Sequence, residues 1–124
     1  MQSAETDYRV ITQEYAKGAI NAAILINGGA AVAVLSQMAN LLPMISSCSL
    51  AIAVLFFAFG VLSGLCAWTV GFLSTRYADR SLRKQEPDFA LSDRYLVLGL
   101  ICIVGCGVCF LFGVIVLAVG FIRP

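Results

Sequence analysis

The sequence predicts an all-α integral membrane protein with three transmembrane helices, a helical hairpin followed by a third span, and a short N-terminal amphipathic helix. The 124-residue chain is 60% hydrophobic and only 12% charged, whereas soluble domains are about half apolar and a quarter charged. No charged residue occurs from Gly18 to Thr75 or from Tyr95 to Ile122. Because about 20 residues of helix cross the roughly 30 Å hydrocarbon core, the first stretch accommodates two crossings and the second accommodates one.

The polar tail, residues 1–17, begins the chain. Within it Tyr8, Ile11 and Tyr15 recur along one side at helical spacing, which is typical of a short amphipathic helix lying along a membrane surface. The tail carries three acidic residues beside one arginine and one lysine, unlike the basic start of a secretory signal. We therefore expect no cleavage.

Span one, residues 18–42, is the most polar of the three because it holds three asparagines, a glutamine and a serine. Asn27 follows Lys17 by ten residues, which is about 15 Å along a helix and hence near mid-membrane. A polar side chain at that depth usually faces protein or water instead of lipid. Asn27 and Gly28 are therefore predicted to lie in helix packing within the chain, in a contact between copies, or beside a water-filled path.

An external hairpin, residues 43–49, is predicted by Pro43 and three nearby serines in the middle of the charge-free stretch, because these residues favour a turn. Span two, residues 50–74, follows. It contains Gly60 and Gly64 as a GxxxG pattern, which permits close approach of another helix. Both glycines are predicted at a helix crossing, within the chain or between copies.

The second polar segment is a loop, residues 75–94, in which Ser92 or Asp93 is expected to cap span three, residues 95–122. Most of the chain's lysines and arginines lie in this loop, so the loop and the tail are predicted to be cytoplasmic and the C-terminus external. We expect insertion in the cell inner membrane. Four of these cations are candidates for contact with lipid headgroups or a partner protein, beyond their ordinary role in setting orientation: Arg76, Arg80, Arg83 and Lys84.

Span three carries small residues at alternating steps of three and four, a spacing that returns to one helix face. We name these the small-residue row: Gly99, Cys102, Cys106, Cys109 and Gly113, with Gly120 seven residues further on. The alternative, a metal or redox site, would need close cysteine pairs and further ligands. Only Cys106 and Cys109 have that spacing, and the chain has no histidine. The row is therefore predicted to be a packing face, with no metal and no cofactor.

Function is predicted only by class. No predicted span holds Asp, Glu, Lys or Arg, which disfavours proton-coupled transport, and no residue set resembles an enzyme's active site. A net charge of +1 gives no nucleic-acid footprint. The first hypothesis is a self-associating protein that forms or perturbs a membrane path, as a pore, holin-like or membrane-effector subunit, with membrane lipid and further copies as partners. The alternative is an accessory or anchor subunit that holds a cytoplasmic protein partner at the membrane.

Overall fold

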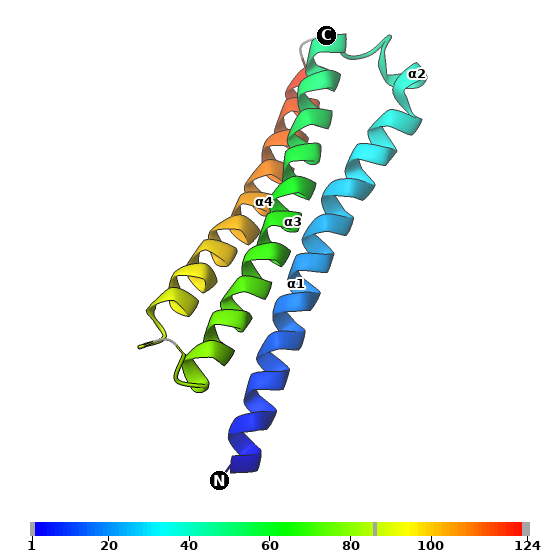
Figure 1. The fold of residues 1–124 in the computed structure, drawn as a ribbon. Helices are drawn as coiled ribbons and strands as arrows, with labels where there is room; N and C mark the ends of the chain where they lie inside the picture. Colours follow the sequence, from blue (N-terminus) through cyan, green and yellow to red (C-terminus); the bar gives the residue numbers. More distant parts are fainter. Residues whose placement is uncertain (1, 86, 123–124) are drawn as a thin grey trace.

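The protein is a bundle of three long helices with one short helix in a connection (Figure 1). The computed structural model describes residues 2–85 and 87–122, with side chains described at Val10 and from Gln13 onward in those ranges. The helices are α1 (Gln2–Ser36), α2 (Met38–Leu41), α3 (Ser47–Leu82) and α4 (Ala90–Ile122). No strand occurs in the ranges described. The predictions of an all-helical chain and of three helices long and apolar enough to cross a membrane are confirmed.

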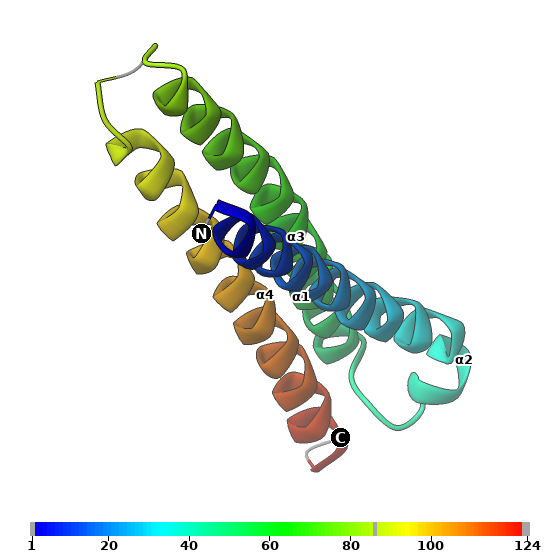
Figure 2. The same ribbon diagram turned by 90° about the horizontal axis from the view of Figure 1, so that it is seen from below.

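The three long helices run alternately up and down. α3 and α4 are antiparallel and pack together along their length, while α1 contacts chiefly α3. The beginning of α1 and the connection from α3 to α4 lie at one end of the bundle, and the connection from α1 to α3 lies at the other end with the end of α4 (Figure 1). Seen from below, α1 crosses the α3–α4 pair at an angle (Figure 2).

The predicted separate N-terminal helix is instead the first part of α1. The helix runs from Gln2 through Gly18 to Ser36 without a break. One glycine inside a helix costs only about 1 kcal/mol, so the change from polar to apolar sequence at residue 18 does not end the helix. Of the expected apolar side, Tyr15 is exposed, while the side chains of Tyr8 and Ile11 lie outside the described residues.

The connection between α1 and α3 is longer than the predicted hairpin, because α1 ends at Ser36 and α2 forms a single turn before the chain reverses. Ser46 caps α3, since its hydroxyl accepts a hydrogen bond of 3.2 Å from the Ser49 amide. Ile45 folds back and is buried. Because of this cap, α3 begins at Ser47, three residues before the predicted start of the second span.

The connection between α3 and α4 is shorter than the segment between the two apolar stretches, residues 75–94, because both helices extend into that segment; a helical extension of the second span toward Gln85 is expected from the sequence. α3 ends in a Schellman motif: Lys84 has a positive φ of 58°, and the Gln85 amide donates to the Arg80 carbonyl at 2.9 Å. Asp88 starts α4 by accepting a hydrogen bond from the Ala90 amide at 3.1 Å. The expected caps, Ser92 and Asp93, lie inside α4 instead.

The buried core lies in the half of the bundle near the connection from α1 to α3. Its central cluster is Val34, Ile45, Leu50, Ala53 and Phe57. At the opposite end, hollows of about 420 and 360 Å³ flank α1 where it faces the other two helices. α1 is therefore packed closely at one end and stands off at the other.

Candidate functional site

The three long helices meet at one point near the middle of the bundle. Asn27 of α1, Gly60 of α3 and Cys106 of α4 form this central contact. The Asn27 side chain is only 1% exposed, and its Nδ2 donates to the Cys106 carbonyl at 3.3 Å and to the Ala23 carbonyl at 3.0 Å. The Cys106 thiol donates in turn to the Gly60 carbonyl at 3.1 Å. The central contact therefore joins all three helices by hydrogen bonds within one chain.

Glycine is required at position 60 because the Asn27 amide occupies the space of a side chain. A Cβ added at Gly60 would overlap Oδ1 and Cγ of Asn27. Oδ1 has no hydrogen-bond donor among the described residues, and it lies where that Cβ would be, so it faces the Cα–H of Gly60. Contacts of this kind recur between closely packed helices. The absent side chain thus lets an asparagine be enclosed between α1 and α3.

The second glycine of the GxxxG pattern, Gly64, extends the same crossing by one turn. A Cβ there would lie 2.5 Å from Cγ1 of Ile24. On α1, Gly28 lies beside Val61, with 3.8 Å between its added Cβ and a Val61 methyl group. The structure therefore brings Asn27, Gly60 and Gly64 together in an α1–α3 crossing inside one chain, with Gly28 at its edge.

The buried residues of α4 are all small and recur every seven positions: Ser92, Gly99, Cys106, Gly113 and Gly120. A repeat of seven keeps one face of a helix against its partner. At Gly113 the space of a side chain is taken by the Phe57 ring, whose nearest atom would be 2.5 Å from an added Cβ. Of the predicted small-residue row, Gly99, Cys106, Gly113 and Gly120 thus lie in the α3–α4 interface.

Cys102 and Cys109 flank that interface and are half-buried. The backbone of Cys102 joins α4 to α3, because its carbonyl accepts a hydrogen bond of 2.8 Å from the Ser63 hydroxyl. Over the described part of the chain, no three Cys, Asp or Glu side chains come together as metal ligands would, and the five cysteines are free thiols. Cys102 and Cys106 contribute backbone acceptors to the packing of the helices, and Cys106 also contributes its thiol donor.

A serine pair that the sequence reasoning missed joins α3 to α4 near their connection. The Ser74 hydroxyl donates to the Ser92 carbonyl at 2.9 Å, and the Ser92 hydroxyl donates to the Ser74 carbonyl at 3.0 Å. Near this pair the rings of Tyr77 and Tyr95 stack with 5.3 Å between centroids. The sequence spacing could have revealed Ser92, because it precedes Gly99 by seven residues and therefore continues the buried face of small residues on α4.

The four predicted headgroup or partner cations are exposed at the end of α3 and in the connection after it. Arg76 and Arg80 lie on α3 and Arg83 follows its last residue, and the steps of four and three place the three arginines on the same side. Arg83 forms an ion pair of 3.1 Å with Asp79, and the Arg80 guanidinium lies over the Tyr77 ring at 5.8 Å. Lys84 belongs to the turn. The structure thus aligns three of the cations along a helix and encloses none of them.

The outer side of α1, opposite Asn27, is a surface that the sequence reasoning did not single out. Its exposed small residues share one face, and we name this the uncovered α1 face: Gly18, Ala22, Gly29, Ala33 and Ser36. A Cβ added at Gly18 or Gly29 would meet no described atom within 4 Å. The outer sides of α3 and α4 instead expose Leu, Ile, Val and Phe, as surfaces facing lipid do.

Comparisons of the chain with known protein families, with curated proteins and with solved structures found no match. Its own geometry is therefore what supports a function. That geometry consists of a bundle closed at the central contact, and of one face of small residues on α1 that nothing in the described chain covers.

Proposed function

We propose that the protein self-associates in the membrane through the uncovered α1 face and forms or perturbs a membrane path, as a pore, holin-like or membrane-effector subunit. The observation that carries this proposal is the composition of that face. Between helices in lipid there is little hydrophobic attraction, and association depends on close van der Waals approach, which Gly, Ala and Ser permit. The bulky, exposed residues Leu25 and Ile26 border the face, and a second α1 helix approaches between them.

The path lies between copies because the inside of one bundle is filled. Asn27 and Cys106 close the middle of the bundle, and the Phe57 ring fills the space against Gly113. Ser36, Gln37 and Asn40 are exposed at the far end of the first span, where they can contact water between neighbouring copies. Small and neutral linings support conduction of weak selectivity.

The orientation follows from charge. The end of the bundle with the α3–α4 connection carries Arg76, Arg80, Arg83, Lys84 and Arg94, whereas the α1–α3 connection carries no Lys or Arg. By the positive-inside rule the first end faces the cytoplasm of an inner membrane.

The test compares two glycines that are equally open in one chain. Gly29 lies on the uncovered α1 face and Gly107 on the outer side of α4, and neither has a described atom within 4 Å of an added Cβ. We expect the purified wild-type protein to have the mass of an oligomer in mild detergent and to release dye from liposomes. Gly29→Leu should shift the mass to the monomer and abolish release, because bulk separates the two α1 helices, while Gly107→Leu should change neither.

A wild-type particle with the mass of one chain would contradict the proposal. So would an oligomer that Gly29→Leu leaves intact, since the contact would then lie elsewhere.

The alternative function, an accessory or anchor subunit, is supported by the three arginines aligned at the exposed end of α3. It requires a stable one-to-one complex with a different protein, and the mass of the particle isolated from its native membrane separates the two functions.

A further inference from the structure

A hollow between α1 and α3 combines an apolar wall with a cation at its mouth. It has a volume of about 360 Å³ and is lined by Ile20, Trp68, Gly71 and Phe72, with Lys17 beside them. A Cβ added at Gly71 would meet no described atom within 4 Å, so the two helices stand apart here. Trp68 also joins the two helices, because its Nε1 donates a hydrogen bond of 3.3 Å to Asn21 Oδ1.

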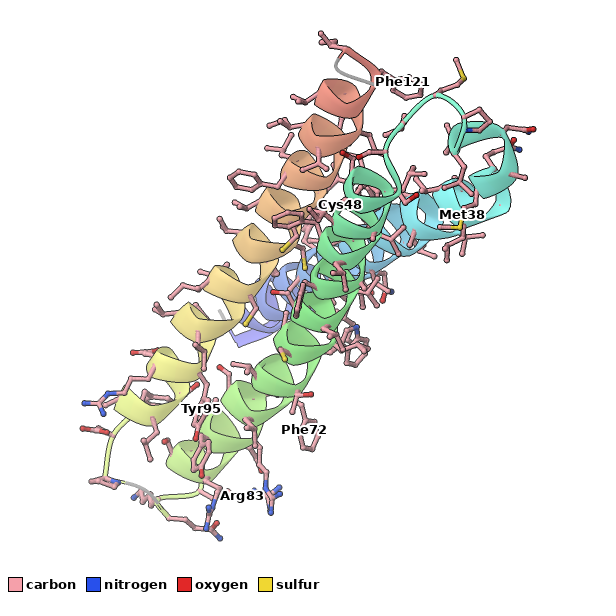
Figure 3. The ribbon with its side chains drawn as sticks, turned by 90° about the horizontal axis from the view of Figure 1, so that it is seen from above. Met38, Cys48, Phe72, Arg83, Tyr95 and Phe121 are labelled. Carbon is pink, nitrogen blue, oxygen red and sulfur yellow. The ribbon has the colours of Figure 1, made fainter. Side chains whose placement is uncertain are left out.

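The hollow opens outward, toward the surroundings of the bundle. Phe72 is 63% exposed and Trp68 is 44% exposed, and Phe72 projects from α3 away from α4 (Figure 3). Lys17 is ten residues from Asn27, which is about 15 Å along the helix. That distance is half of a roughly 30 Å hydrocarbon core, so the Lys17 ammonium reaches the level of lipid phosphates.

Positive charge is concentrated at this mouth. The pairings of Ile24 with Gly64 and of Asn21 with Trp68 set the α1–α3 register, which puts Lys17 level with Phe72 and puts Arg76 one turn further out. The nearest acid on α3, Asp79, is engaged by Arg83 at 3.1 Å. Glu14 borders a separate surface on the outer side of α1. An apolar hollow beneath two cations matches an acyl chain beneath an anionic headgroup.

We propose that this hollow binds one anionic phospholipid, with an acyl chain against Gly71 and Trp68 and the phosphate held by Lys17 and Arg76. This inference is independent of self-association, because the hollow faces away from the uncovered α1 face. The lipid fills the volume where α1 stands off from α3. It thereby couples the tilt of α1 to the headgroup charge of the surrounding membrane.

Trp68 is the only tryptophan of the chain and lines the hollow, so its fluorescence reports the occupant directly. The protein is reconstituted in phosphatidylcholine vesicles that contain either brominated phosphatidylglycerol or brominated phosphatidylcholine at equal mole fraction, because bromine on an acyl chain quenches a contacting indole. We expect stronger quenching by the anionic lipid. Lys17→Gln and Arg76→Gln should each reduce the preference about fivefold, the effect of one cation near a membrane surface.

Two further variants test the hollow itself. Gly71→Leu should reduce quenching by both brominated lipids, because the new side chain fills the volume, and its circular dichroism should stay that of the parent. Gly107→Leu and Arg94→Gln are the matched controls and should leave both signals unchanged. Equal quenching by the two lipids in the wild type would overturn the proposal. Trp68 shielded from both lipids would also overturn it, since a second copy would then cover the hollow.

Discussion

Gly60→Ala tests the central contact by adding a single methyl group. The new Cβ would overlap Oδ1 and Cγ of Asn27 and lie 2.8 Å from its Nδ2. The amide cannot simply swing away, because Nδ2 is held by the carbonyls of Ala23 and Cys106. Either α1 moves off α3, or Asn27 rotates and loses its bond to α4.

Both responses lower the stability of the bundle. Forcing one extra carbon into a filled interface costs about 1 to 3 kcal/mol, and a hydrogen bond between membrane helices contributes about 0.6 kcal/mol on average. Replacing glycine by alanine within a helix gains up to about 1 kcal/mol, and this gain is shared by Gly107→Ala, whose added Cβ meets no described atom within 4 Å. We therefore expect Gly60→Ala to be less stable than Gly107→Ala by about 1 to 3 kcal/mol.

The assay is unfolding by sodium dodecyl sulfate in mixed micelles, followed by the fluorescence of Trp68. This indole bonds to Asn21 across the α1–α3 contact, so its signal reports separation of those helices. A double-mutant cycle with Asn27→Ala completes the test. Removing the amide also removes the overlap, so the double variant should be more stable than the sum of the single losses predicts, by about 1 to 2 kcal/mol.

Two results would refute this reasoning. Equal unfolding midpoints for Gly60→Ala and Gly107→Ala would mean that no side chain occupies the space beside Gly60. Strict additivity in the cycle would mean that Asn27 and Gly60 do not contact each other.

Three other predictions use the same chain. Cys106→Ala should lower the free energy of unfolding by at most about 1 kcal/mol, because it removes one weak thiol donor, whereas Cys106→Leu should lower it by about 1 to 3 kcal/mol through overpacking; equal losses in the detergent titration would contradict this. Ser74→Ala and Ser92→Ala should each cost about 1 kcal/mol, and the double variant less than their sum, while additive losses would show that the two hydroxyls act separately. A reporter fused after Gln85 should be cytoplasmic and one fused at the C-terminus external, and an internal C-terminus would contradict this topology and would mean that α1 does not cross.

The number of long helices could be predicted from the sequence because it depends on local properties. In lipid, a segment must satisfy its backbone polar groups internally, so an apolar stretch of sufficient length becomes a helix whatever its neighbours are. The ends of the helices could not be predicted in the same way. α1 begins at Gln2 and α4 at Ala90, outside the apolar stretches, because polar residues are compatible with a helix that continues beyond a membrane.

The candidate packing residues show the same division. The sequence by itself determined which faces are small: the GxxxG pair of α3, the small-residue row of α4 and, in hindsight, the glycines of α1. In the sequence, the small-residue patterns of the three helices cannot be told apart. Only the tertiary structure decided that Gly60 and Cys106 meet inside the bundle while Gly29 stays uncovered.

The partner of Asn27 is the clearest case. Its depth in an apolar helix predicts that the amide needs a polar partner, because an unpaired amide in hydrocarbon is costly. The acceptor, the Cys106 carbonyl, lies 79 residues away and is a backbone atom, which no residue type marks. Local sequence sets how each helix forms and which of its faces can approach another helix closely, but the choice of partner depends on how three complete helices fit together.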